Sequence, residues 1–356
     1  MKLEKQKEYK VPTAIHGLTA TADGGKLYAA CLDGQVLEVD AESGKTEEFE
    51  GRHGSFASGC VLLPDGKTLI TSGYDGMILW HDTATRKCWR RVKAHSFWSW
   101  KMALSPDGRY IASVSGQYLA GGLKYEPLPS PEPCVRVFDT ASGEVLRDYH
   151  HLPPVLSVAF SPDSRHVAAG NMMGGMRVWN LDTPGQDPVA DFTSPDFTSW
   201  GTTKSHHYCG GIYDLVFSPD GGTLVACGMG PMVDPMAGNG KMTWQRWDWK
   251  ASPAKQMDKI KDSDQGSGLM ESVAFAPGGA HFVMAGRQAQ GTWNAAVFDA
   301  VQGGLTCSLD TKCRVTKALF TGTEGTIWLA GAQGQPNREN GKWRDYGRLL
   351  RCRFEA

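Results

Sequence analysis

The residues of this chain best suited to bind a metal stand close together in one segment. His206, His207 and Cys209 offer imidazole and thiolate groups, which are the ligands that zinc prefers. Such a site needs a third and a fourth ligand, and adjacent side chains point to opposite sides of an extended chain. We therefore expect loop histidines and no metal site.

An acidic segment, Asp262-Ser263-Asp264-Gln265-Gly266, is similar to the start of a calcium-binding loop. It lacks the third acidic ligand and the late bidentate glutamate that such a loop uses. The sequence therefore predicts a solvated acidic turn here.

Two basic segments could in principle contact nucleic acid. Residues 86–93 mix arginine, lysine and tryptophan, as nucleic-acid surfaces do. Lysine and arginine are also typical of outer strands, where they protect an open sheet edge, and we expect such a strand here. Near the C-terminus four arginines follow one strand, which predicts a solvated strand face: Arg344, Arg348, Arg351 and Arg353.

Signals for catalysis are weak throughout the chain. The sequence holds no Gly-x-Ser-x-Gly turn, no cysteine with an evident histidine partner, and no glycine-rich loop followed by a helix. The acids Asp214 and Glu271 stand alone in apolar segments that we expect to be inner strands. These observations predict a protein that is not an enzyme and that has no cofactor.

Charge and cysteine usage narrow the possible partners. The 356 residues carry a formal net charge of −1, whereas general binding to nucleic acid or to anionic lipid needs a basic excess. No apolar run is long enough to span a bilayer, and residues 1–10 do not resemble a signal peptide. The nine cysteines form no CxxC pair, which indicates reduced thiols and a cytoplasmic location.

A recurring turn organises the chain. Two short segments of alternating apolar residues flank it, which is typical of antiparallel strands. Proline presets φ in this turn, aspartate caps it, and glycine accepts a positive φ. The copies are Thr21-Ala22-Asp23-Gly24, Leu63-Pro64-Asp65-Gly66, Ser105-Pro106-Asp107-Gly108, Ser161-Pro162-Asp163-Ser164 and Ser218-Pro219-Asp220-Gly221, with weaker ones at 276–279 and 321–324.

Each of the first six turns is followed by a strand and then by another strand that ends in a characteristic pair; no such pair follows the seventh turn. These pairs are Val39-Asp40, His81-Asp82, Phe138-Asp139, Trp179-Asn180, Trp247-Asp248 and Phe298-Asp299. They resemble the Trp-Asp pair of the WD40-repeat family, and His53-Gly54, Ala94-His95, His150 and His151 stand where that family carries Gly-His. The resemblance covers the whole chain.

This resemblance implies an all-β fold: one domain over residues 1–356, a seven-bladed β-propeller with four antiparallel strands per blade. It also implies that an N-terminal strand over residues 3–11 completes the last blade and closes the ring. In that family a His, a Ser or Thr, an Asp and a Trp form a hydrogen-bonded cluster in each blade. Blade 2 comes closest with His53, Ser72 and Asp75, although His81 takes the tryptophan position.

The insertions indicate which face is used. In such propellers the second-to-third-strand loops and the connections between blades share one face, the top. Every sizeable insertion falls on these connections, in blades 3 to 7: residues 116–133, 193–211, 229–241, 288–292 and 333–345. Insertions collected on one face predict a binding surface.

These insertions are rich in aromatic residues and methionine, which are enriched at the cores of protein interfaces. We expect a protein or peptide partner of unknown identity to bind there, through Tyr118, Leu123, Tyr125, Phe197, Trp200, His206, His207, Met229, Met232, Met236, Arg338 and Trp343. Two alternatives stay open. One is an enzyme or a small-ligand or metal sensor at the top of the central channel, near Asp214, His206, His207 and Glu271. The other is a structural subunit of a larger assembly that also uses the outer rim. The sequence leaves the oligomeric state open.

Overall fold

A computed structural model describes the fold over residues 1–121, 126–200, 208–234, 237–322, 325–333, 338–339, 342–343 and 346–355. For residues 120–121, 126, 198–200, 208–209, 338–339 and 342–343 only the backbone is described. The chain divides into two compact units. Unit 1 holds residues 1–99, 274–287 and 292–356, and unit 2 holds residues 100–273 and 288–291.

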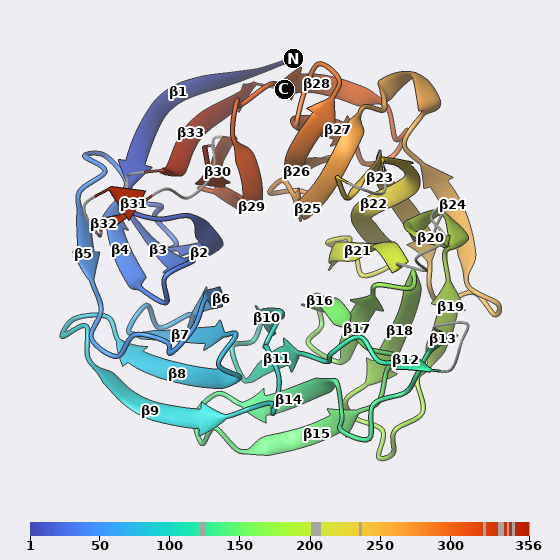
Figure 1. Ribbon diagram of the computed structural model, residues 1–356, viewed down its shortest axis with the longest axis horizontal. Coiled ribbons are helices and arrows are strands. Elements are labelled where there is room, and N and C mark those ends of the chain that lie inside the picture. The colour runs from blue at the N-terminus through green and yellow to red at the C-terminus, as the bar shows by residue number, and fades with distance from the viewer. Residues whose placement is uncertain are drawn as a thin grey trace. The chain divides into compact units, whose positions relative to one another are not determined.

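Unit 1 is built from antiparallel sheets of short strands (Figure 1). Its first sheet contains β2 (Ile15–Ala20), β3 (Lys26–Cys31), β4 (Val36–Asp40) and β5 (Thr46–Glu48). The second contains β6 (Ala57–Leu62), β7 (Thr68–Gly73), β8 (Met77–Asp82) and β9 (Cys88–Lys93). The remaining strands are β26 (His281–Gln290), β27 (Ala295–Asp299), β28 (Leu305–Leu309), β29 (Arg314–Thr321), β30 (Thr326–Ala332), the short β31 (Arg338–Glu339) and β32 (Lys342–Trp343), β33 (Gly347–Glu355) and β1 (Lys2–Val11).

Unit 2 repeats the same pattern. One of its sheets contains β10 (Lys101–Leu104), β11 (Tyr110–Val114), β14 (Val135–Asp139) and β15 (Val145–Tyr149), and another contains β16 (Val155–Phe160), β17 (His166–Asn171), β18 (Gly175–Asn180) and β19 (Ala190–Thr193). Next come β20 (Thr198–Trp200), β21 (Tyr208–Phe217), β22 (Leu224–Asp234), β23 (Asn239–Asp248), β24 (Lys255–Lys259) and β25 (Ser267–Phe275). A two-stranded hairpin, β12 (Ala120–Gly121) and β13 (Glu126–Pro127), and two 3-10 helices, η1 (Pro195–Phe197) and η2 (Asp262–Asp264), complete it.

The recurring turns join first strands to second strands, as the sequence predicts. In three of them a serine hydroxyl donates to the aspartate, at 2.6 Å for Ser105 Oγ to Asp107 Oδ1, and a backbone N–H two residues later donates to the same oxygen. Gly24, Gly66, Gly108 and Gly221 all have φ near +70°. Ser164 adopts the same left-handed backbone, with φ of 59°.

The N-terminal strand joins the C-terminal end of the chain. β1 pairs antiparallel with β33 over nine residue pairs, from Lys2 opposite Glu355 to Val11 opposite Gly347 (Figure 1). The sheet order is β1-β33-β30-β29, so residues from both ends of the chain form one four-stranded sheet. Leu3 and Val11 are buried in it.

Two expectations about strands are wrong. Arg348 does not lie on a solvated face of β33: it is buried, 3.3 Å from Glu8 Oε1 and 3.0 Å from Gln333 Oε1, because β1 covers that edge. The expected loops at 229–241 and 288–292 are largely strand. β22 continues to Asp234 and β23 begins at Asn239, and their pairing contains two register shifts. β26 runs to Gln290.

The buried core includes thiols. Eight cysteines of the described chain are free, and Cys31, Cys60, Cys134, Cys227, Cys313 and Cys352 are buried. Burial raises the pKa of Cys60 and Cys352 to about 12, and of Cys134 and Cys313 to about 11. Among the described residues, neither helix is long and apolar enough to cross a membrane.

Candidate interaction site

A row of aromatic side chains lies along the ends of two sheets in unit 1. Its members come from four short segments: the start of β2, the β5–β6 connection, the β7–β8 turn and the segment after β9. They are His16, Phe56, Tyr74, Phe97 and Trp98, called here the aromatic row.

The rings follow one another in contact. The centroids of Tyr74 and Trp98 are 4.8 Å apart with an interplanar angle of 5°, and those of Phe97 and Trp98 are also 4.8 Å apart. Phe56 lies 5.4 Å from Tyr74 and 6.1 Å from His16. Phe56 and Trp98 are each 40% exposed. Large, rigid aromatic side chains that stay exposed in a group are typical of protein-binding surfaces.

A buried polar chain positions two members of this row. His53 Nδ1 lies 3.0 Å from Asp75 Oδ1, and its Nε2 lies 2.9 Å from Thr71 Oγ1. The Thr71 hydroxyl is also 3.1 Å from His81 Nε2, so it lies between two imidazoles. His53 belongs to the connection that carries Phe56, and Asp75 follows Tyr74. The chain thus ties both segments together.

The prediction of which residue supplies the hydroxyl of this cluster is wrong by one position. Thr71, not Ser72, bonds to His53, because successive side chains of a strand point to opposite faces. Ser72 lies instead 3.2 Å from Ser58 Oγ. Gly73 must be glycine, because a Cβ there would lie 2.4 Å from His53 Nδ1.

Two members of the cluster, Asp75 and His81, keep a fixed charge near neutral pH. Burial alone would raise the pKa of Asp75, but hydrogen bonds from His53 and from the backbone N–H groups of Gly54 and Met77 outweigh it and lower that pKa. Burial lowers the pKa of His81 to about 4. Asp75 is therefore ionised and His81 neutral.

Backbone contacts hold the segment after β9 in place. The N–H groups of Ala94 and His95 both donate to the carbonyl of Gly76, and Ser99 N donates to Gly73 O. Lys93 Nζ donates to Asp75 O at 2.8 Å. Phe97 and Trp98 are thus presented on a short, anchored segment beside Tyr74.

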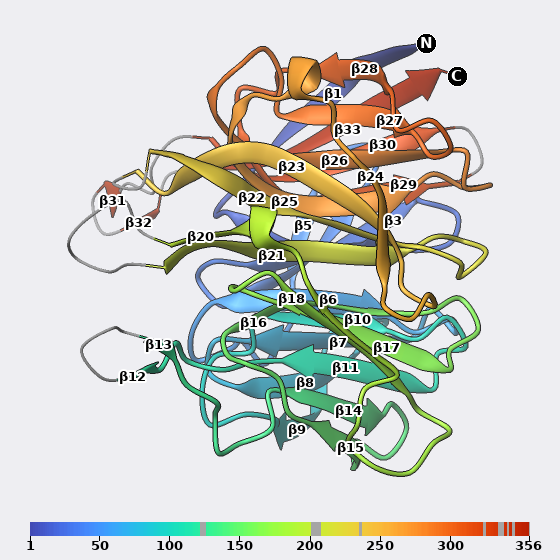
Figure 2. The ribbon, with the colours of Figure 1, turned by 90° about the vertical axis from the view of Figure 1, so that its right-hand side faces the viewer.

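The insertions of unit 2 form a second candidate surface. Figure 2 shows the β12–β13 hairpin, β20 and the outer ends of β22 and β23 protruding from the same side of this unit. β20 pairs with β21 from Thr198 opposite Gly210 to Trp200 opposite Tyr208. Two apolar side chains of these insertions are exposed: Leu128, by 44%, and Val233, by 48%.

The structure separates the predicted contact residues into groups. Tyr118 and Met232 are half-buried. Phe197 and Met229 are buried, at 0% and 4% exposure, so their interpretation as contact residues is wrong: Phe197 packs with Ile212 and Trp247 in the core of unit 2. Leu123, Tyr125, His206, His207 and Met236 lie outside the described residues, and Trp200, Arg338 and Trp343 are described by backbone only.

The acids of the inner strands have structural partners. Asp214 Oδ1 lies 2.9 Å from Lys101 Nζ, and Asp214 Oδ2 accepts a hydrogen bond from Val273 N at 3.0 Å. Lys101 also donates to the carbonyls of Tyr213 and Glu271. The ion pair links three strands of unit 2 and satisfies both charges. Within the described parts of the chain, no three His, Cys, Asp or Glu side chains are grouped so as to hold a metal ion.

Sequence reasoning missed the aromatic row because it followed insertion length, and the row lies on connections without insertions. A signal was present in the sequence. His53 is followed three residues later by Phe56, and His95 is followed by Phe97 and Trp98, each time directly before an inner strand.

Comparisons with known proteins agree with the repeat pattern. A family model described as "WD domain, G-beta repeat" matches residues 143–180 and 199–233. Eukaryotic translation initiation factor 3 subunit I of Bombyx mori is 30% identical over 163 residues, which are 46% of this chain and 44% of that protein. Target of rapamycin complex subunit wat1 of Schizosaccharomyces pombe is 29% identical over 162 residues, 45% of this chain and 41% of that protein. The chain thus spans less than half the length of these relatives.

Proposed function

Because this chain belongs to the WD40-repeat family, we propose that it is a non-catalytic cytoplasmic scaffold that binds a protein or peptide partner. The aromatic row carries this proposal: five rings in contact, two of them 40% exposed, on segments fixed by a buried polar cluster. A rigid aromatic surface binds a partner at low cost in conformational entropy. The buried, free cysteines support a reducing compartment.

We further propose that the chain is one domain, a closed ring of seven blades. Within the described residues, five four-stranded sheets support this number. The remaining long strands form one nine-stranded sheet that contains two further sets of four, β21–β24 and β25–β28, joined by the pairing of β23 with β25. The pairing of β1 with β33 supports closure.

The insertions of blades 3 to 7 are a second proposed partner surface. The proposed contacts on the insertions are Tyr118, Leu123, Tyr125, Trp200, His206, His207, Met232, Met236, Arg338 and Trp343. The exposed Leu128 and Val233 favour this arrangement, because each leaves apolar surface uncovered beside a proposed contact.

An active site at the channel is the weaker candidate. Asp214, one of the two acids named for it beside Glu271, is bonded to Lys101 and to the backbone of Val273. A carboxylate held by a cation and an amide is poorly suited to accept a proton from a substrate.

The test compares variants of one surface with a matched control. The tagged chain is purified from its native cells, once intact and once as the double variant Phe56→Ala/Trp98→Ala, and any protein that co-purifies in stoichiometric amount is identified. The affinity of that protein for each purified chain is then measured. We expect the double variant to bind at least about tenfold more weakly, because central aromatic residues each contribute about 2 kcal/mol or more. Trp89→Ala is the control: Trp89 is 52% exposed, on the outer strand β9.

A structural subunit of a larger assembly is the second candidate function. The relatives above are named as subunits of complexes. Outer strands of this chain carry exposed apolar side chains: Trp89 on β9, Val145 and Leu146 on β15, and Met257 on β24. Loss of the partner with Trp89→Ala and its retention with Phe56→Ala/Trp98→Ala would favour the rim over the aromatic row.

A further inference from the structure

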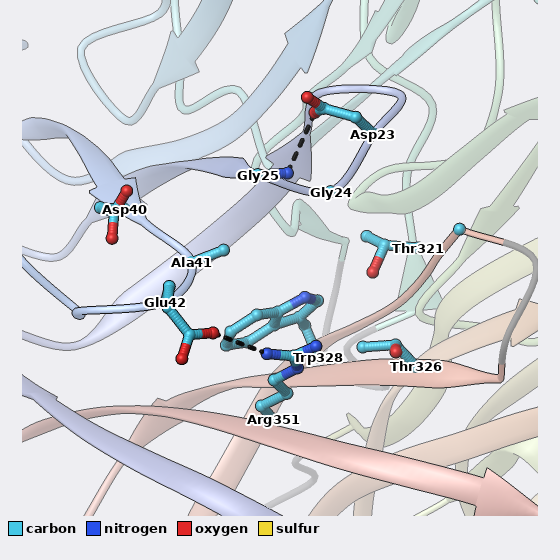
Figure 3. A pocket seen from close by; sticks show the side chains of 11 residues that line it. Asp23, Gly24, Gly25, Asp40, Ala41, Glu42, Thr321, Thr326, Trp328 and Arg351 are labelled. Carbon is cyan, nitrogen blue, oxygen red and sulfur yellow. Dashed lines mark hydrogen bonds and ion pairs between the residues drawn. The ribbon is translucent and has the colours of Figure 1, made fainter.

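A polar pocket of about 550 Å³ opens in unit 1 at the end of β2 opposite to the aromatic row (Figure 3). Its walls are the β2–β3 turn, the β4–β5 turn and strands β30 and β33. Its volume falls in the range of roughly 300–1,000 Å³ that is typical of ligand pockets. The proposed scaffold function makes no use of it.

Two of its carboxylates have no cation bonded to them among the described residues. Asp23 Oδ1 accepts from Thr21 Oγ1 and from Gly25 N, and Asp40 Oδ1 accepts from the N–H and hydroxyl of Ser43. These neutral donors lower the pKa of both acids, so both stay ionised. Glu42 differs, because it is paired with Lys7 and with Arg351, whose Nη1 is 3.2 Å away.

The floor of the pocket offers hydrogen-bond donors. Trp328 is 1% exposed, and its Nε1 has no hydrogen-bond partner among the described residues. The buried Nε of Arg351 also has no hydrogen-bond partner among the described residues. Figure 3 shows the Trp328 indole between Glu42 and Thr321, with its nitrogen on the side of Thr321. A buried N–H without an acceptor is destabilising, so an acceptor from a ligand would stabilise this arrangement.

We propose that this pocket binds a basic residue, arginine or lysine, whose cationic side chain meets Asp23 and Asp40 while a neighbouring carbonyl oxygen accepts from Trp328 Nε1. Acids without a bonded cation at the rim and unused donors at the floor together favour a ligand that carries both a cation and an acceptor. A peptide segment and a free basic amino acid share this chemistry.

Calorimetric titration of the full chain tests the proposal. The probes are acetyl-Gly-Arg-Gly-amide, its lysine counterpart, free arginine, and a peptide with citrulline as the uncharged analogue. We expect the basic probes to bind, and to bind several-fold more weakly when salt shortens the Debye length to about 3 Å. Tighter binding of the peptides than of free arginine assigns the site to a partner segment, and the reverse assigns it to the free amino acid.

Matched variants separate binding from folding. Asp40→Asn should weaken binding at least about tenfold. Asp82→Asn is its control, because Asp82 Oδ1 accepts from the N–H and hydroxyl of Thr85 in the same way, in a turn outside the pocket. Trp328→Phe removes the floor donor and should also weaken binding.

The proposal is overturned if the intact chain binds none of the basic probes, if the citrulline peptide binds equally well, or if Asp82→Asn weakens binding as much as Asp40→Asn. Melting curves of each variant establish that it is folded. Should Asp40→Asn unfold, Asp23→Asn with the corresponding control Asp65→Asn answers the same question. None of these residues belongs to the aromatic row, so failure here leaves the proposed function untouched.

Discussion

At the scale of single residues, the hydroxyl of Thr71 connects two buried imidazoles and thereby the segments that carry Phe56 and Tyr74. Its replacement by valine keeps the shape of the side chain and removes the hydrogen-bonding oxygen. We expect Thr71→Val to lower the free energy of unfolding by about 2 kcal/mol, because two buried nitrogens lose their partner.

Ser72→Ala is the control for this prediction, and denaturant unfolding is the measurement. Ser58 Oγ keeps its bond to Ser99 O without Ser72, so the loss should stay below about 1 kcal/mol. A larger loss with Ser72→Ala than with Thr71→Val would contradict the observed register.

Buried histidines make stability depend on pH. Burial lowers the pKa of His151 to about 3, whereas an unfolded histidine titrates near about 6.5. Between these values the unfolded chain binds more protons than the folded chain, so the free energy of unfolding falls as pH drops from 6.5 toward 3, by up to about 1.4 kcal/mol per pH unit.

Unfolding in urea at about pH 7 and about pH 5 measures this effect. His151→Gln should show a smaller difference between the two pH values. His150→Gln should behave like the intact chain, because the His150 side chain is exposed. Equal pH dependence in all three proteins would disprove the role of His151.

At the scale of elements, β1 covers an edge of the last sheet that would otherwise be open. Without it, Leu350, Cys352 and Phe354 of β33 lose their neighbour, and an open apolar edge also invites aggregation. We expect deletion of residues 1–10 to lower the melting temperature by about 5 °C or more. Lys10→Ala, on an exposed position of the same strand, should leave it unchanged. A deleted chain that melts like the intact one would contradict this role.

Local chemistry explains which elements could be predicted. The aspartate turns follow from residues within a few positions, and they occur where expected. The ends of β22 and β23 could not be predicted, because methionine, glycine and proline at 229–236 give no strand pattern and only the pairing across the hairpin extends them.

The candidate site was predictable only in part, for a similar reason. His53 and Asp75 were identified, but the choice between Thr71 and Ser72 depends on a one-residue register that alternating residues do not fix. The aromatic row joins residues as far apart as His16 and Trp98, whose contacts exist only in the folded unit.

At the scale of the whole molecule, the proposed closed ring can be distinguished from two separate units by small-angle X-ray scattering. A compact chain of this length has a radius of gyration of about 20 Å. We expect that value for the intact protein in dilute solution. A clearly larger radius, or a scattering curve with two resolved bodies, would reject the closed ring.

The rates at which the buried thiols react can report how often each part of the fold opens. Only a thiolate reacts with an alkylating reagent, and burial keeps six thiols away from solvent: Cys31, Cys60, Cys134, Cys227, Cys313 and Cys352. Burial also raises the pKa of the thiols of Cys31, Cys60, Cys134, Cys313 and Cys352. Each of them can therefore be alkylated only when its own strand or connection opens. Brief exposure to reagent followed by mass spectrometry would thus rank the sheets by how often each one opens, without introducing a single probe residue.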